Sequence, residues 1–253
     1  MIAAATLKLA LAAPAAAVPE HVAGGDHWRL ETDQGPVHVW KPDRYEAQTA
    51  GIVLYVHGYY VTADGAWDQV ATPFAHSALN ALLVVPEAPS GAEDAVRWNR
   101  AEDLIQAVAA GTGLRPPPGP VITIGHSGAF RTILPWLPSS RLDQLVLLDA
   151  LYGDVAPFRD WLRTAPVRLV NRMIVVAVET AGNADLLWRA FSGARRDAIP
   201  ESEAELQPKE RRARLLYFKS QYTHDELVTD GRVLSLLLRL TPLPRLPGGS
   251  SAN

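Results

Sequence analysis

Small residues surround Ser127 at the point where an apolar run meets a stretch of helical spacing. Residues 121–124 are Val-Ile-Thr-Ile, a composition typical of a buried parallel strand. Gly125 stands two residues before the serine, Ala129 two residues after it, and Gly128 directly follows it. A serine on a sharp strand-to-helix turn crowds these neighbours together, so they must be small. The pattern predicts a nucleophilic hydroxyl above the sheet, with amides of the following helix facing any oxyanion formed there.

A simpler interpretation is that Ser127 caps a helix, since serine is a favourable N-cap. Other residue types decide between the two, because a serine hydroxyl is a weak nucleophile until a base accepts its proton. Histidine suits that step near neutral pH, and a carboxylate must then orient its ring. Asp149 ends a predicted strand after Ser127, and His224 follows the last predicted strand. Ser, Asp and His thus occur in the chain order of one known catalytic triad.

Seven histidines compete for the role of base, and position favours His224. Residues 223–226, Thr-His-Asp-Glu, could also begin a capped helix or ligate a metal. No second histidine or acid pair has ligand spacing, so we predict no metal site. The other histidines are expected at the surface (His21, His27, His38, His76), in a turn held by hydrogen bonds (His57) and in the loops behind the nucleophile (His126).

Alternating and continuous apolar runs predict the elements that would position these side chains. A hairpin is expected over 28–40, and strand–helix units of about 30 residues follow it. They predict an α/β fold: a mostly parallel central sheet of about eight strands with helices on both faces. Ligands of such sheets bind at the carboxyl ends of the strands, where the polar candidates stand. Predicted strands cover 51–58, 81–86, 121–124, 144–149, 172–178 and 215–219, and the main predicted helices cover 66–80, 92–110 and 227–240.

Together these features resemble the α/β-hydrolase superfamily of serine esterases and lipases, over residues 51–240. In that family, the amides just after a His-Gly turn and just after the nucleophile bind the oxyanion. The resemblance therefore implies Tyr59 (or Tyr60) and Gly128 as oxyanion-hole residues. The motifs that carry the resemblance are His57-Gly58, the pentapeptide Gly125-His-Ser-Gly-Ala129, an acid after a later strand and His224 after the last one.

The triad acid has two candidates. Most α/β-hydrolases carry it after the second strand beyond the nucleophile, which here points to Glu179 or, less directly, Asp185. A minority, similar to platelet-activating-factor acetylhydrolases and chlorophyllases, place it after the first, where residues 147–153 read Leu-Leu-Asp-Ala-Leu-Tyr-Gly. We favour Asp149, which emerges as the strand ends. Glu179 is the alternative acid, and its other expected roles are a hydrogen bond to the His224 loop or substrate binding.

The composition fits one α/β domain over residues 1–253, with 48% hydrophobic and 20% charged residues. A net charge of −3 provides neither a basic field for a nucleic-acid partner nor a polybasic membrane anchor, so we expect neither. The sequence contains no cysteine, which excludes disulfides, thiolate metal sites and a cysteine nucleophile.

Three segments have further expectations. Residues 1–20, alanine-rich and apolar, could form a secretory signal or a flexible N-terminus; a cytoplasmic location is slightly favoured over export, and no segment has the length of an integral membrane span. Residues 183–214 stand where a lid-like insert would fit, although a helix packed on the sheet is the simpler form of their apolar positions. Residues 242–253, rich in Pro, Gly and Ser, are expected to be a flexible tail.

The sequence predicts a serine hydrolase that cleaves a carboxylic ester, or an amide, of a small-molecule substrate through an acyl-enzyme and without a cofactor. A binding protein that uses the same fold without catalysis is the alternative; such proteins usually lose a triad residue, whereas Ser127, Asp149 and His224 are all present. A third hypothesis is a relative that cleaves carbon–carbon or carbon–halogen bonds. Serine at the turn disfavours the haloalkane version, which resembles enzymes with aspartate there.

Overall fold

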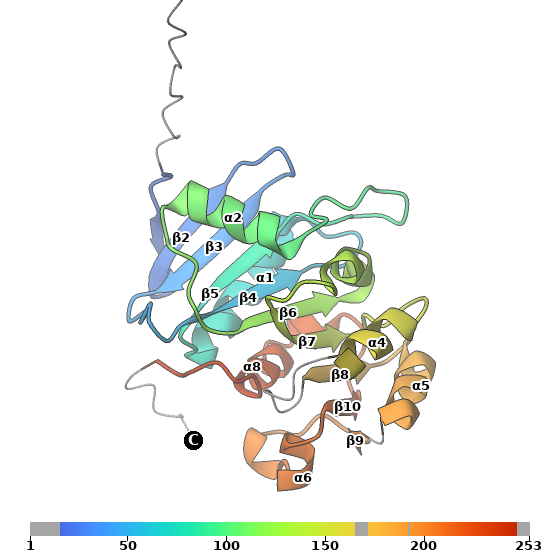
Figure 1. The fold of residues 1–253 in the computed structure, drawn as a ribbon. Coiled ribbons are helices and arrows are strands. Elements are labelled where there is room, and N and C mark those ends of the chain that lie inside the picture. Colours follow the sequence, from blue (N-terminus) through green and yellow to red (C-terminus); the bar gives the residue numbers. More distant parts are fainter. Residues whose placement is uncertain (1–15, 165–171, 192, 247–253) are drawn as a thin grey trace, which may run out of the picture.

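A ten-stranded sheet forms the centre of the molecule (Figure 1). The computed structural model describes residues 16–164, 172–191 and 193–246. The predicted apolar runs become its strands, and two three-residue strands, β1 and β9, extend the sheet at its edges beyond the expected eight. The strands are β1 (Glu20–Val22), β2 (Gly25–Leu30), β3 (Val37–Pro42), β4 (Gly51–Val56), β5 (Ala81–Pro86), β6 (Val121–His126), β7 (Leu142–Leu148), β8 (Met173–Ala177), β9 (Ala194–Arg196) and β10 (Leu215–Lys219).

The sheet consists of an antiparallel part, formed by β1, β2 and β3, and a parallel part, formed by the other seven strands. Its strand order is β1-β2-β3-β5-β4-β6-β7-β8-β10-β9, and the pairs β1–β2, β2–β3 and β3–β5 are antiparallel. The register aligns Val56 with Gly125, His126 with Leu148, and Leu148 with Val176. The residues that follow β4, β6, β7 and β8 therefore meet at one end of the sheet, as predicted for a ligand site.

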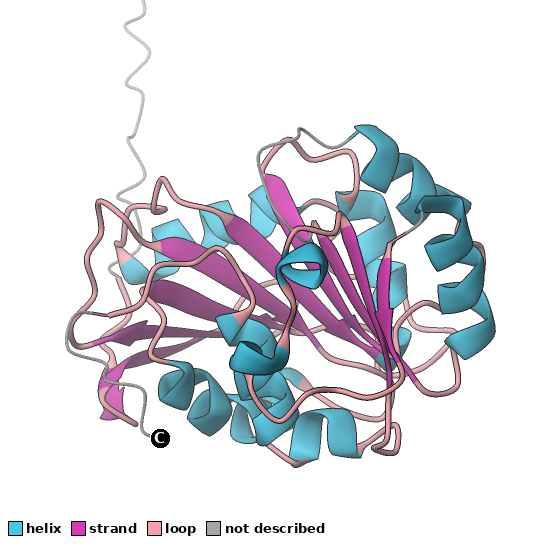
Figure 2. Ribbon diagram, turned by 90° about the horizontal axis from the view of Figure 1, so that it is seen from below, coloured by secondary structure: helices cyan, strands magenta, loops and turns pink. Residues whose placement is uncertain are grey.

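Helices cover both faces of the sheet, as Figure 2 shows. On one face, α2 (Ala101–Thr112), α4 (Ala156–Thr164) and α5 (Ala181–Phe191) contribute to one apolar core. On the other, α1 (Ala63–Ser77), α7 (Glu226–Thr229) and α8 (Arg232–Arg239) contribute to a second core. The shorter helices are η1 (Ser127–Ala129), α3 (Phe130–Ile133), η2 (Leu134–Trp136), η3 (Glu203–Glu205) and α6 (Pro208–Arg211). The α/β class predicted from the sequence is confirmed.

The helix predicted over 92–110 is shorter at its start, because α2 begins at Ala101. Val96 and Trp98 continue the apolar helical spacing upstream, but both lie in a loop, where Val96 is partly buried and Trp98 is buried. Trp98 is 5% exposed, and its carbonyl accepts a hydrogen bond from the indole N–H of Trp136 at 2.7 Å. The backbone of Arg100 is extended (φ −139°, ψ 133°), so the helix cannot continue upstream of Ala101.

The surface position predicted for His27 and His38 is wrong. Both are buried, and their rings stack on the indole of Trp67 in α1 with centroids 4.0 Å and 5.4 Å away. Nε2 of His27 lies 2.9 Å from Nδ1 of His38, whose Nε2 lies 2.8 Å from the Asp64 carboxylate. The hairpin is covered on both faces, so alternation along its strands does not separate a dry face from a wet one.

The three segments singled out above lie partly outside the described residues. Of residues 1–20, only 16–20 are described, and β1 begins at Glu20. Residues 183–214 include most of α5, which packs on β8 and β10, and the edge strand β9, so a lid stays a prediction. In the predicted tail, the backbone of residues 244–246 bonds with that of residues 78–80 after α1. Within the described ranges, no helix has the length and apolarity of a membrane span.

Candidate active site

Ser127 lies directly after β6, on a backbone with φ 53°. This left-handed conformation is strained for a non-glycine residue, and it is the turn that the small neighbours predicted. A Cβ atom on Gly125 would lie 3.0 Å from the Cβ of Ala129, so both positions must stay small. A Cβ on Gly128 would lie 2.5 Å from the ring of Tyr59, which packs directly on that glycine.

Gly58 packs against the candidate nucleophile itself. A Cβ atom there would lie 2.6 Å from the Cβ of Ser127 and 3.3 Å from its hydroxyl oxygen. Gly58→Ala is therefore expected to displace the serine and to slow its reaction with a fluorophosphonate by about 10²-fold, the scale of a 1 Å misplacement. Gly182→Ala is the matched control, since a Cβ at Gly182 meets nothing within 4 Å. Equal labelling rates for the two variants would contradict the assigned contact.

Asp149 occupies the equivalent position after β7. It follows Leu148, the register partner of His126, and it too is left-handed, with φ 45°. The side chain is fully buried (0% exposed) and accepts hydrogen bonds from the next strand end. Its donors are the amides of Val178 (3.0 Å), Glu179 (3.0 Å) and Thr180 (2.9 Å), and the hydroxyl of Thr180 (2.7 Å).

His224 completes this set of contacts. It lies in the loop between β10 and α7, and its Nδ1–H donates to the Asp149 carboxylate at 2.7 Å. Burial by itself would raise the pKa of Asp149, but the hydrogen bonds from His224 and Thr180 outweigh it and hold that pKa well below its usual range. The same bond to Asp149 raises the pKa of His224 above 6.5, against the opposing effect of burial. An ionised carboxylate thus fixes the tautomer of a half-buried imidazole, with Nε2 as its free nitrogen.

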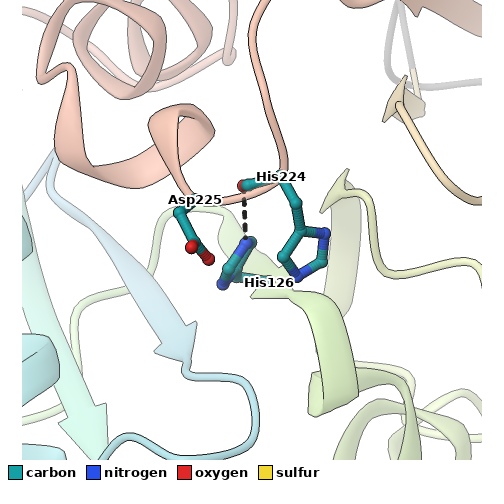
Figure 3. A group of neighbouring side chains, drawn as sticks. All are labelled: His126, His224 and Asp225. Atoms are coloured by element: carbon teal, nitrogen blue, oxygen red, sulfur yellow. Dashed lines mark hydrogen bonds between the residues drawn. The ribbon is translucent and has the colours of Figure 1, made fainter.

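His126 joins the His224 loop to the end of β6 (Figure 3). Its Nε2–H donates to the His224 carbonyl at 3.1 Å, and the two ring centroids are 4.5 Å apart. Burial, together with the charge of nearby His224, lowers the pKa of His126 to about 4. The side chain therefore contacts the loop that carries the candidate base, in place of the loops behind the nucleophile. Because Ser127 is the next residue, this contact brings the segments of the candidate nucleophile and base together.

The turn after β4 has the predicted hydrogen bonds. Nδ1 of His57 lies 2.8 Å from the Gly58 carbonyl and Nε2 accepts from the Ala88 amide at 3.0 Å, so this ring is neutral and holds two loops together. The Tyr60 amide donates to the Ser90 carbonyl at 2.8 Å. Of the two tyrosines considered for the oxyanion hole, Tyr60 thus has its amide committed elsewhere.

Glu179 lies beside the Asp149–His224 pair without replacing it. Its side chain is exposed, and the hydroxyl of Tyr152 donates to it at 2.8 Å. One carboxylate oxygen of Glu179 lies within 4.8 Å of ligand atoms on both Asp149 and His224. The less direct candidate, Asp185, pairs with Arg195 at 3.2 Å. Asp149 alone among these acids has a hydrogen bond from the His224 ring in the described structure.

Three groups of side chains within the described residues could hold a cation. They are His126–His224–Asp225, Asp149–Glu179–His224, and the exposed group His21–Asp26–Asp43. The sequence missed the first of these because His126 and His224 are 98 positions apart. Thr180 and the amides of residues 178–180 were also missed, and a backbone donor has no signature in a sequence.

Comparisons with known proteins agree with this architecture. Neither protein-family models nor curated proteins give a match. Among solved structures, an S-formylglutathione hydrolase from Agrobacterium tumefaciens is similar with a TM-score of 0.56 and 11% identity, over 88% of this chain and 97% of that one. The feruloyl esterase module from Clostridium thermocellum has a TM-score of 0.54 and 11% identity, over 92% and 96%. An S-formylglutathione hydrolase from Staphylococcus aureus has a TM-score of 0.52 and 10% identity, over 86% and 96%. The chain therefore has the α/β-hydrolase fold.

Proposed function

We propose that this protein is a serine hydrolase that cleaves a carboxylic ester, with amides as a second substrate class, through an acyl-enzyme. The observation that carries the proposal is the 2.7 Å hydrogen bond between His224 and the buried Asp149, at the sheet end where Ser127 occupies a left-handed turn. Three residue types that a triad requires thus reach one end of the sheet from three separate segments. The structural neighbours include two S-formylglutathione hydrolases and a feruloyl esterase, and their activities support ester hydrolysis.

In the first half of the proposed reaction, the Ser127 hydroxyl attacks the substrate carbonyl and its proton passes to Nε2 of His224. Asp149 stays ionised and stabilises the imidazolium through Nδ1–H. The amides of Tyr59 and Gly128 bind the oxyanion, and His224 then protonates the departing alcohol. In the second half, His224 takes a proton from water, the resulting attack on the acyl-enzyme releases the carboxylic acid, and the proton returns to Ser127.

A fluorophosphonate probe tests the nucleophile directly, because it phosphonylates an activated serine. We expect the wild-type protein to bind one equivalent, and peptide mass spectrometry to find it on Ser127. A panel of small esters of graded acyl length, assayed on the same protein, then measures turnover. Labelling at another residue, or binding of esters without turnover, would reject the proposal, and the latter result would favour a non-catalytic binding protein.

The pH dependence of kcat/KM should report His224. The neutral imidazole is the base, so the rate falls as pH drops through the pKa of this residue. Because the Asp149 hydrogen bond raises that pKa, half-maximal activity is expected above pH 6.5. Ester hydrolysis measured from pH 5 to pH 9 checks this, and a half-maximal point below the ordinary histidine value of about 6.5 would contradict it.

A further inference from the structure

His126, His224 and Asp225 come together at the end of β6 (Figure 3). This group shares His224 with the Asp149–His224 pair but does not include Asp149. One ligand atom of each lies within 4.8 Å of those of the other two. Two imidazoles and a carboxylate are a donor set that Zn²⁺ and similar divalent transition ions bind, usually with water in the fourth position. The sequence concealed this set because the fold supplies the second histidine from the loop after β10, 98 positions further along the chain.

The hydrogen bonds of both rings leave one nitrogen of each available. A carbonyl accepts the Nε2–H of His126, and a carboxylate accepts the Nδ1–H of His224. Histidines that ligate metals commonly donate their other N–H to such a partner, which orients the ring and raises its basicity. His126 therefore offers Nδ1, and His224 offers Nε2. Asp225 is the N-cap residue of α7, but its side chain makes no capping hydrogen bond, so its exposed carboxylate is not committed to the helix.

The other two groups fit less well. In Asp149–Glu179–His224, the Nδ1–H of His224 and the Asp149 carboxylate already satisfy one another, and the Thr180 hydroxyl and three amides also donate to Asp149. In the group around His21, His21 and Asp43 are exposed to water and Asp26 already pairs with Lys41 at 2.7 Å, so its ligands are less available to an ion. The group around His126 has one buried ring, one half-buried ring and one exposed carboxylate free to close on an ion.

We propose that His126, His224 and Asp225 bind a divalent transition metal ion such as Zn²⁺, and that the bound ion inhibits hydrolysis. The ligand atoms of a tetrahedral site lie about 3.3 Å apart at metal–ligand distances of about 2.0–2.1 Å. Rotation of the exposed Asp225 side chain can supply much of the closure. An ion on Nε2 of His224 occupies the electron pair that would accept the Ser127 proton. Metal binding stands on this geometry alone, whereas inhibition rests on the proposed function.

Calorimetric titration with Zn²⁺ tests the binding without any need for activity. The starting protein is the Ser127→Ala variant that also carries His21→Asn, which removes the exposed group, and one equivalent of zinc should bind. His126→Gln keeps an N–H for the His224 carbonyl but loses the imidazole, and Asp225→Asn keeps the shape but loses the charge. Each is expected to weaken zinc binding by at least about tenfold, since even indirect partners of a metal contribute that much. Unchanged affinity in both variants, or loss of binding with His21→Asn alone, would overturn the proposal.

Inhibition is measured on the protein with Ser127 intact. Half-inhibition of ester hydrolysis should occur at the zinc concentration that equals the calorimetric Kd, and a chelator should reverse it. Asp225→Asn, compared with its own rate in the absence of zinc, should lose the sensitivity to zinc. Zinc binding without inhibition would overturn the second half of the proposal. A wild-type protein that hydrolyses no ester would reject the proposed function, while the zinc titration of the Ser127→Ala protein would still decide the metal site.

Discussion

Ser127→Ala is expected to lower kcat for ester hydrolysis by about 10⁵–10⁶-fold, the scale of losing the nucleophile of a triad. Alanine has no oxygen with which to form the acyl-enzyme, so only binding and the oxyanion amides can still act. The substitution removes one hydroxyl from a half-buried side chain, and its effect on stability should be small. Steady-state kinetics with the best ester of the panel measure the first effect, and thermal unfolding measures the second.

Ser202→Ala is the matched control for this experiment. It makes the same chemical change at the residue that caps η3, within 183–214, which is not one of the strand ends that carry the candidate site. We expect ester turnover within about twofold of wild type, because Ser202 caps η3 and makes no hydrogen bond to Ser127, Asp149 or His224 within the described residues. If Ser127→Ala kept more than a few per cent of wild-type kcat while Ser202→Ala behaved normally, Ser127 would not be the nucleophile.

Asp149→Asn should have the second largest effect, a fall in kcat of about 10⁴-fold, as for removal of the orienting charge from other triads. The amide cannot stabilise the imidazolium, and its NH₂ group would face donors that the carboxylate now accepts from. Glu179→Gln should reduce kcat by less than about tenfold, because Glu179 is exposed and its bond is to Tyr152. Kinetics on both variants rank the two acids.

Misfolding of Asp149→Asn would also lower kcat, so the kinetic comparison with Glu179→Gln needs a structural measurement beside it. The Nδ1–H proton of His224 in its short bond to Asp149 should give a downfield NMR resonance in the wild-type protein. It should persist in Glu179→Gln and disappear in Asp149→Asn. A larger fall in kcat for Glu179→Gln, with the resonance intact in Asp149→Asn, would transfer the role of the acid to Glu179.

The sequence predicted the sheet well because its strands are continuous apolar runs buried on both faces, such as residues 81–86. It failed where tertiary contacts override local spacing. Trp98 continues the apolar spacing of α2, but it lies in a loop, and its carbonyl accepts a hydrogen bond from the indole of Trp136. His27 and His38 are polar by type, yet α1 covers them and Trp67 stacks on both. Neither burial can be inferred from residue type alone.

The candidate site also has parts that the sequence predicted and parts that depend on tertiary contacts. Positions after strand ends pointed to Ser127, Asp149 and His224, because chain order and side-chain chemistry are local information. The partners of Asp149 are mostly backbone amides at the end of β8, and they depend on how two strands align. The contact of His126 with the His224 carbonyl likewise needs the β6–β10 arrangement in space. Support of this kind becomes visible only with coordinates.

The left-handed Asp149 is held by amides of residues 178–180, which directly follow β8, so its orientation depends on the last third of the chain. A folding intermediate with only β1 to β7 in place would display the hydroxyl of Ser127 without an aligned acid or a base. Recovery of ester turnover during refolding therefore reports when β8, β10 and the loop after β10 pack onto the sheet. We expect this recovery to occur later than the burial of the tryptophans on the N-terminal hairpin.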